Sequence, residues 1–359
     1  MSYVTNALIV CNAAQVSLAD EWQAEAPMGA DEMTPLEDVL MSPANSRGIQ
    51  QRMTNDRGKT PKVEVDYSPR WLENEYEDGV ANPRCSGGEL RGDFTKEYTM
   101  PTTYLGPTTP LQYTAEDFAD YCRNDVARVL RDINAMVDGL ERTIATQHAQ
   151  EFALLAGNWG TGIFTTGNAV GNVNSSNEYI VQTLKSGGDP YPQGLTQLRI
   201  ARMKAGLGNV VGFGGSDMWS YLETLAIGCC SDSGIDLLAS LNRNGLSYGY
   251  DKRLEDAMAS SAKFMLYRLG SALPLYLTKA NWRTGMPGVV EGSNYTHTGI
   301  SSPKFGIPMD LTITDNCGTV TIAVATATKL IGTPTDQFQT GDLYFGINGI
   351  AKGLITNPS

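Results

Sequence analysis

The chain has 359 residues, of which 41% are hydrophobic and 8% aromatic, enough for one large domain or two modest ones. Its formal net charge of −12 comes from 39 acidic and 27 basic residues, and this balance argues against a dedicated nucleic-acid-binding protein, which usually carries a basic face. The 38 glycines and 17 prolines predict many turns and a mixed fold with loops over much of its surface.

Cysteine and histidine spacing shows no metal or redox motif. The cysteines form no C-x-x-C pair, and neither histidine has His or Cys three or four residues further on, so we expect no metal ion and no cofactor. Reduced thiols in a cytosolic product are the favoured interpretation. The residues concerned are Cys11, Cys85, Cys122, Cys229, Cys230, Cys317, His148 and His297.

The first 46 residues carry seven acidic side chains and no basic one. The absence of early positive charge predicts no signal peptide, and the apolar stretches fall well short of the ~20 residues that span a bilayer. One or two helical turns are expected at 35–41. Because a segment of this composition would be disordered alone, we predict an extended arm held by a neighbouring subunit, with pockets for Leu36, Val39 and Leu40.

A long β flap is predicted after the arm. Basic residues dominate 47–62, and the alternation of Val63, Val65 and Tyr67 with polar residues predicts a strand over 62–67. A second strand is predicted over 94–100. A two-stranded ribbon is marginal alone, so we expect it to pack on something else. Its candidate subunit contacts are Arg57, Lys59, Trp71, Tyr76 and Phe94.

The clearest element is an amphipathic helix from Ala115 to about Leu155. Thr114 and Asp117 resemble a capping box, and apolar residues then recur at steps of three and four. A coiled coil is the alternative, but no strict heptad persists. We predict that the stripe packs on a sheet with Val320, Ile322 and Val324 from the other end of the chain. The stripe consists of Phe118, Cys122, Val126, Val129, Ile133, Val137, Leu140 and Ile144.

Shorter elements follow this helix. Helices are predicted over 195–207 and from Ser216 onward, and strands over 209–213, 263–268, 273–277, 309–314, 319–325 and 343–347. The turn at 315–318 would join two of these strands as a hairpin.

Three short motifs resemble functional sites, but the sequence around each of them does not fit such a site. Gly206, Gly208 and Gly212 follow a helix and precede a strand, whereas a phosphate loop needs the reverse order. Met218 replaces the final glycine of a nucleophile elbow around Ser216, which is better read as a helix N-cap. Arg91-Gly-Asp93 is read as a tight turn. We therefore predict that the chain is not an enzyme.

The order of elements resembles a known plan. An arm, a strand-rich flap, one very long helix, a mixed domain and returning strands are similar to the Hong Kong ninety-seven type capsid fold of tailed-phage shells and encapsulin compartments. The stretch from Asn209 to Leu222 is similar to an axial strand and helix of that family. The resemblance covers nearly the whole chain in order, with weak sequence motifs.

This resemblance implies an α+β fold with an N-terminal arm over 1–54 and an extended β flap, or E-loop, over 55–107. A peripheral domain with the spine helix would follow over 108–192, an axial domain over 193–305, and C-terminal strands over 306–359 that return to the peripheral domain. No scaffolding segment precedes the spine helix, so scaffolding would come from a separate protein.

The implied function is a major capsid protein that self-assembles, as hexamers and pentamers, into an icosahedral shell around double-stranded DNA. Expected partners are other copies of the chain, scaffolding and portal proteins, and packaged DNA by non-specific proximity, without a membrane. The location would be the virion capsid, assembled in the host bacterial cytoplasm. The alternatives are an encapsulin-like compartment, a surface adhesin and a hydrolase with dispersed carboxylates.

Overall fold

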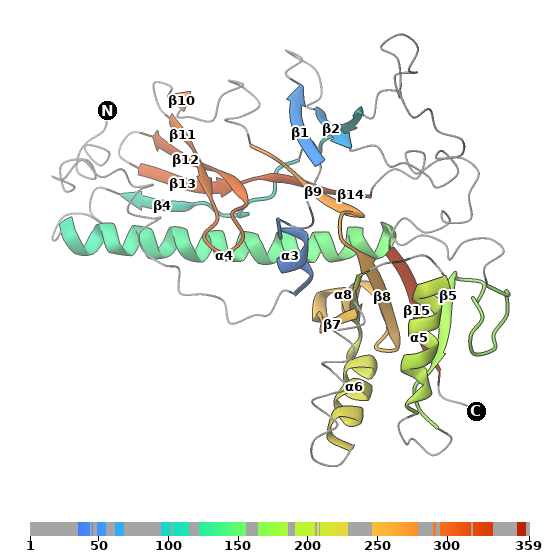
Figure 1. Ribbon diagram of the computed structural model, residues 1–359. Helices are drawn as coiled ribbons and strands as arrows, with labels where there is room; N and C mark the ends of the chain where they lie inside the picture. Colours follow the sequence, from blue (N-terminus) through green and yellow to red (C-terminus); the bar gives the residue numbers. More distant parts are fainter. Residues whose placement is uncertain are drawn as a thin grey trace, which may run out of the picture.

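One long helix, α4 (Cys122–Leu155), joins the two bodies of the molecule in the computed structural model (Figure 1). At about 1.5 Å per residue it is about 50 Å long. An antiparallel sheet lies along one side of it, and a mixed α/β body lies at its C-terminal end. The structure describes residues 35–43, 45, 49–54, 62–67, 95–101, 103–114, 122–155, 164–185, 191–204, 207, 209–228, 246–278, 290–291, 295–316, 319–332 and 350–356.

The antiparallel sheet has five strands in the order β10-β11-β12-β13-β4. In β13 the burial pattern alternates, and Val320, Ile322 and Val324 face α4, where they meet Ile133 and Val137. This confirms the predicted packing of the helix on strands from the far end of the chain. The strands are β10 (Val290–Glu291), β11 (Tyr295–Ser301), β12 (Pro308–Asn316), β13 (Thr319–Ala325) and β4 (Leu111–Thr114).

The base of the predicted flap is a three-stranded antiparallel sheet, β1-β2-β3. It packs on a two-stranded ribbon of β9 and β14 through Val63, Val65 and Met100 on one side and Leu273 and Leu275 on the other. The expectation that the flap needs support is therefore confirmed at its base. The bounds are β1 (Ile49–Thr54), β2 (Lys62–Tyr67), β3 (Thr95–Thr99), β9 (Ala272–Leu277) and β14 (Ala327–Gly332).

The second body is a mixed sheet in the order β5-β15-β8-β6-β7, covered on both faces. Phe264 and Leu266 of β8 face one core with α5 and α6, while Met265 and Tyr267 face the other with α3 and α8. Burial on both faces explains the continuous apolar run of β8. The bounds are β5 (Glu178–Gln182), β15 (Ile350–Thr356), β8 (Lys263–Arg268), β6 (Val210–Gly214), β7 (Leu246–Tyr250), α3 (Pro35–Leu40), α5 (Gln193–Lys204), α6 (Ser216–Gly228) and α8 (Lys252–Met258).

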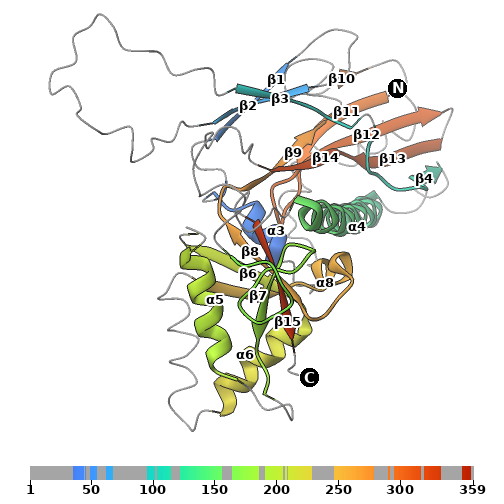
Figure 2. The same ribbon diagram turned by 90° about the vertical axis from the view of Figure 1, so that its right-hand side faces the viewer.

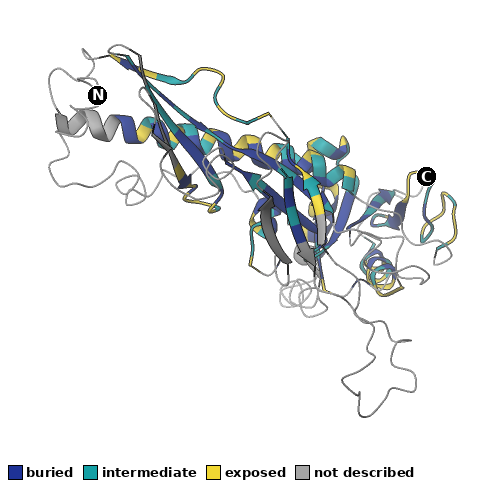
Figure 3. Cartoon of the chain, turned by 90° about the horizontal axis from the view of Figure 1, so that it is seen from above, coloured by how far each residue is buried: buried dark blue, intermediate teal, exposed yellow. Residues whose placement is uncertain are grey.

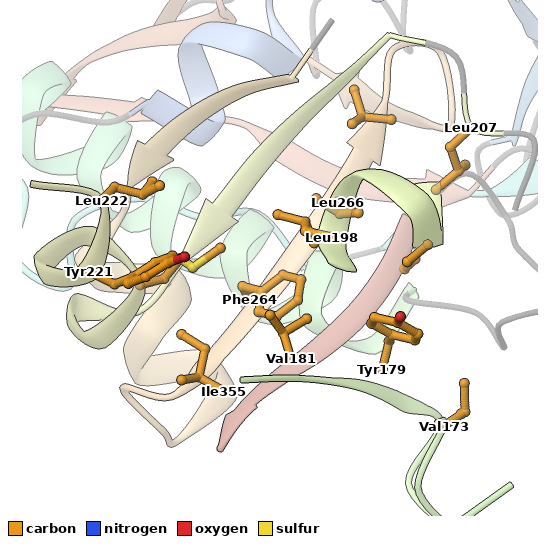
Figure 4. Packing of buried hydrophobic residues seen from close by; sticks show 14 of the residues in the cluster. Val173, Tyr179, Val181, Leu198, Leu207, Tyr221, Leu222, Phe264, Leu266 and Ile355 are labelled. Atoms are coloured by element: carbon orange, nitrogen blue, oxygen red, sulfur yellow. The ribbon is translucent and has the colours of Figure 1, made fainter. Parts of the chain in front are cut away.

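The core that contains α5 and α6 is tightly packed where β15 pairs with β8 (Figure 4). A Cβ atom on Gly353 would lie 1.9 Å from the Phe264 ring, so only glycine fits beneath this side chain. Figure 3 shows the burial of each described residue, with buried residues along the inner sides of strands and helices. The shared sheet places the C-terminal strand β15 between β5 and β8.

Most predicted elements are present with small shifts in their bounds. β8 and β13 begin and end where expected, and the hairpin between β12 and β13 is confirmed by their register, in which Asn316 pairs with Thr319. Within the described residues, the elements that were not predicted are β1, β4, β5, β7, β10, β11, β14, β15 and α8. The strand expected over 343–347 and the start of the long helix at 115–121 lie outside the described residues.

Replacing Ile133 with Asp should lower the free energy of unfolding by at least about 3 kcal/mol, because the carboxylate would be buried without a partner. Ile133 is 1% exposed in the core between α4 and the antiparallel sheet. The measurement is urea unfolding followed by far-UV circular dichroism.

The matched control is Ala135→Asp, which adds the same charge to an exposed position of the same helix. It should cost less than about 1 kcal/mol. Equal unfolding midpoints for the two variants would contradict the packing of α4 on the sheet.

Candidate functional site

The candidate interface residues of the predicted arm lie in α3, which packs against α4 (Figure 2). Leu36 and Leu40 are each 2% exposed and belong to the core shared by α3, α4, α8 and the mixed sheet, while Val39 is partly buried beside it. The side chains of Leu36 and Leu40 are therefore covered by their own chain. Arg57, Lys59, Trp71, Tyr76 and Phe94 lie outside the described residues, and their role at subunit contacts stays a prediction.

A buried polar cluster fastens α3 to the rest of the molecule. The Glu37 carboxylate lies 2.9 Å from Nδ1 of His148, and the His148 Nε2 atom lies 2.7 Å from the Thr328 hydroxyl. Glu37 is 1% exposed and His148 is fully buried. These residues come from α3, α4 and β14, so the cluster joins three elements that are far apart in the sequence. His148 is thus a packed residue.

Both ring nitrogens of His148 have hydrogen-bond partners on other elements. Nδ1 contacts the Glu37 carboxylate of α3, and Nε2 contacts the Thr328 hydroxyl of β14, which also lies 3.2 Å from the carbonyl of Leu275. These contacts bind α3 and β14 to α4.

Tyr276 of β9 completes the cluster. Its hydroxyl donates to Glu37 at 3.2 Å, and its ring lies against that of His148 with centroids 5.9 Å apart. Burial raises the pKa of the Tyr276 hydroxyl well above its ordinary value, and the nearby Glu37 carboxylate raises it further. Tyr276 therefore keeps its proton and acts as a donor to Glu37.

Two more buried side chains hold the ends of the α3 segment. Asp251 accepts the backbone amide of Leu36 at 3.2 Å while also capping α8. Beyond α3, the fully buried Asn45 donates to the carbonyls of Leu40 and Ala272 at 2.9 Å and accepts from the Tyr267 hydroxyl and the Gly270 amide. Residues 35–45 are thus held by side chains at both ends.

Sequence reasoning missed most of this cluster. Glu37 was counted only as arm charge, and Asn45, Asp251, Tyr276 and Thr328 were not singled out. The one local signal was Asp251 before Lys252-Arg253-Leu254-Glu255, a typical N-cap pattern that identifies α8. The partners themselves lie more than a hundred positions apart, since Glu37 and His148 are separated by 111.

Glu141 is another buried acid, about two helical turns before His148 along α4. Its Oε1 atom is buried without a hydrogen-bond partner among the described residues. Burial raises the pKa of its carboxyl, and the neighbouring Ser302, Lys304 and Phe305 amide offset only part of this shift. Its burial therefore costs free energy whenever the carboxyl is ionised.

The described residues contain no group of His, Cys, Asp and Glu that could hold a metal ion. Ser216 is the first residue of α6, as predicted, and among the described residues no hydrogen bond joins it to a histidine. Its amide and hydroxyl instead donate to the carboxylate of Glu255, at 2.7 Å and 3.2 Å. None of the described helices is long and apolar enough to cross a membrane. The polar clusters are therefore arranged to fasten segments together.

Comparisons with known proteins give structural similarity alone. No family model and no curated protein matches the sequence. Among solved structures, the chain is similar to one in the capsid of Myoviridae phage XM1, with 9% identity, 96% and 97% of the two chains covered, and a TM-score of 0.41. A chain in the capsid of cyanophage A-1(L) is 12% identical, with 92% of this chain and 95% of that chain covered and a TM-score of 0.43. A chain in the capsid of Ralstonia phage GP4 is 11% identical, with 97% of each chain covered and a TM-score of 0.41.

Replacing His148 with Ala should lower the free energy of unfolding by about 3–5 kcal/mol, because it leaves the Glu37 carboxylate buried without its partner. Adding Glu37→Gln should recover part of this loss by removing the charge. Arg142→Ala is the control on the same helix, since its exposed pair with Asp138 is worth about 0.5 kcal/mol. Equal losses for H148A and R142A in chemical unfolding would contradict the buried pair.

A pH dependence is expected from Glu141. Because the folded pKa of this carboxyl lies above its ordinary value of 4.5, its contribution to stability decreases as the pH rises through the interval between the two. Glu141→Gln removes that loss. Measured by unfolding from about pH 4 to about pH 8, the stability of the variant relative to the parent should therefore rise. A constant difference across this range would contradict the raised pKa of the buried Glu141 carboxyl.

Proposed function

We propose that this chain is the major capsid protein of a tailed bacteriophage, a subunit that assembles into an icosahedral shell around double-stranded DNA. The observation that supports it best is the packing of α4 on two separate bodies of the molecule. Its apolar stripe packs on a sheet built from segments before and after it, and its end packs into a separate body formed largely by the middle of the chain. This arrangement matches the capsid plan that the order of elements resembles.

The finer assignment follows the same plan. In it α4 is the spine helix, the antiparallel sheet with α4 is the peripheral domain, the mixed sheet with α5 and α6 is the axial domain, and β1-β2-β3 is the base of the E-loop. The pairing of β5 and β15 with β8 supports placing both strands in the axial domain rather than the peripheral one. The arm would leave the subunit at α3, whose position is set by the Glu37–His148 pair.

The contacts of the buried polar residues support a structural role for them. Within the described residues, Glu37, Asp251 and His148 bind other segments of the chain. The net charge of −12 supports a container wall that lies near DNA without gripping its phosphates. We propose other copies of the chain as partners in hexamers and pentamers, with separate scaffolding and portal proteins, in the virion and during assembly in the bacterial cytoplasm.

The direct test is electron microscopy of the purified full-length protein, expressed with and without the other head proteins of its phage. Closed shells are expected, at least with scaffolding protein present. A monodisperse monomer at high concentration under both conditions would contradict the proposal. Shells that enclose a cargo enzyme rather than DNA would favour the encapsulin-like compartment.

Two deletions distinguish the contribution of residues 2–34 to assembly from the contribution of α3 to the stability of the subunit. Removing residues 2–34 should leave a folded, soluble subunit, because α3 and its buried contacts remain, while the shells become fewer or misshapen. Removing residues 2–45 also deletes Leu36, Glu37, Leu40 and Asn45, so the subunit itself should lose several kcal/mol of stability. The measurements are circular dichroism and electron microscopy. Equal thermal stability of the two deletions would contradict the docking of α3.

A further inference from the structure

The outward surface of α5 combines positive charge with exposed apolar side chains. Ile200 and Met203 are 45% and 65% exposed, and Arg199 is exposed beside them. The helix has three basic residues and no acidic one. Its opposite side is buried through Leu198 and Ala201, so the exposed residues lie on the side away from the sheet. We call Arg199, Ile200 and Met203 the basic face.

The outward surface of α6 has the opposite charge. Asp217 and Glu223 are exposed, Trp219 is 37% exposed, and the helix has no basic residue. The Trp219 indole donates to Glu223 at 2.9 Å, so the aromatic ring and the carboxylate form one fixed unit. Met218 and Leu222 bury the other side of the helix in the same core as α5. We call Asp217, Trp219 and Glu223 the acidic face.

The positive charge on α5 has no acidic counterpart among the described residues. Among the described residues, no carboxylate forms an ion pair with Arg199, Arg202 or Lys204. The Nε and Nη1 atoms of Arg202 are buried without a hydrogen-bond partner, and burial lowers the pKa of its guanidinium, with the like charge of Arg199 acting in the same direction. Buried guanidinium atoms of Arg202 that lack a hydrogen-bond partner among the described residues cost free energy, and the exposed apolar side chains of Ile200 and Met203 beside it are typical of a contact surface.

We infer that the basic face of α5 binds the acidic face of α6 on a second copy of the chain. The two faces offer opposite charge and an apolar contact, with Ile200 and Met203 against the Trp219 ring. Exposed ion pairs contribute little, so the apolar contact supplies most of the affinity, while the charges select α6 and reject a second α5. A contact between two helix faces is smaller than a standard interface and acts together with other contacts of the subunit.

This inference rests on the proposed shell function, and charge exchange tests it separately. The variants are Arg199→Glu, Glu223→Arg and the double variant, purified as full-length protein and measured by sedimentation velocity and electron microscopy of assembled particles. Each single variant puts like charges opposite each other and should lower the yield of particles roughly tenfold or more. The double variant restores opposite charge and should recover most of the yield.

Lys252→Glu is the matched control, because it reverses an exposed charge on α8 that belongs to neither face, and it should assemble like the parent. Circular dichroism of each variant establishes that the subunit is folded. If the parent assembles and both single variants assemble equally well, the inference is wrong while the shell function stands. If the double variant remains as poor as the single ones, the pairing of α5 with α6 is wrong. A parent that fails to assemble even with scaffolding protein present overturns the shell function itself.

Discussion

The packing of one helix into two cores is the constraint on which the rest of the structure depends. The first half of the described stripe of α4, from Val129 to Ile144, packs on the antiparallel sheet, whereas Ala149 and Phe152 pack with α3, α8 and the mixed sheet. A helix cannot change the direction of one part without changing the other, because its backbone hydrogen bonds are continuous. The two bodies are therefore held at a relative position that α4 sets.

Polar side chains on α4 lie where these two cores meet. Glu141, His148 and Glu151 are buried or partly buried, and Glu151 accepts the backbone amide of Leu330 at 2.6 Å. An apolar stripe alone would allow β14 and α3 to slide along the helix, since hydrophobic contact is not directional. The hydrogen bonds between His148 and both Glu37 and Thr328 require one position, so they specify where the segments lie.

The sequence predicted those elements whose pattern is local. The stripe of α4 and the alternation of β2 and β13 repeat over several turns or residues, and such a pattern survives in any tertiary context. β14 and β15 were missed because their burial is set by their partners. The sequence Ala327-Thr-Lys-Leu-Ile-Gly332 has no regular alternation of apolar and polar residues, and its burial follows from contact with β9 and α4. Helix α8 is only seven residues long, and its cap at Asp251 is its main signal.

The α3 cluster was beyond sequence reasoning for a different reason. Its composition, acidic and rich in proline, is typical of a segment that needs an external anchor, so Leu36 and Leu40 were expected to reach a neighbour. The structure supplies the anchor within the same chain, through residues whose separations in sequence are 111 for Glu37 and His148 and 222 for Asn45 and Tyr267. No spacing rule links positions so far apart.

The place of β15 within the mixed sheet has a consequence for the order of folding. A ribosome makes β5 and β8 long before it makes residues 350–356, yet β15 is the strand that lies between them. Until it is inserted, one edge each of β5 and β8 is unpaired and Phe264 has no glycine to cover, so the nascent chain carries an open sheet that could pair with another chain. The subunit can thus complete this body, and any surface for self-association that includes it, only after translation has passed residue 356.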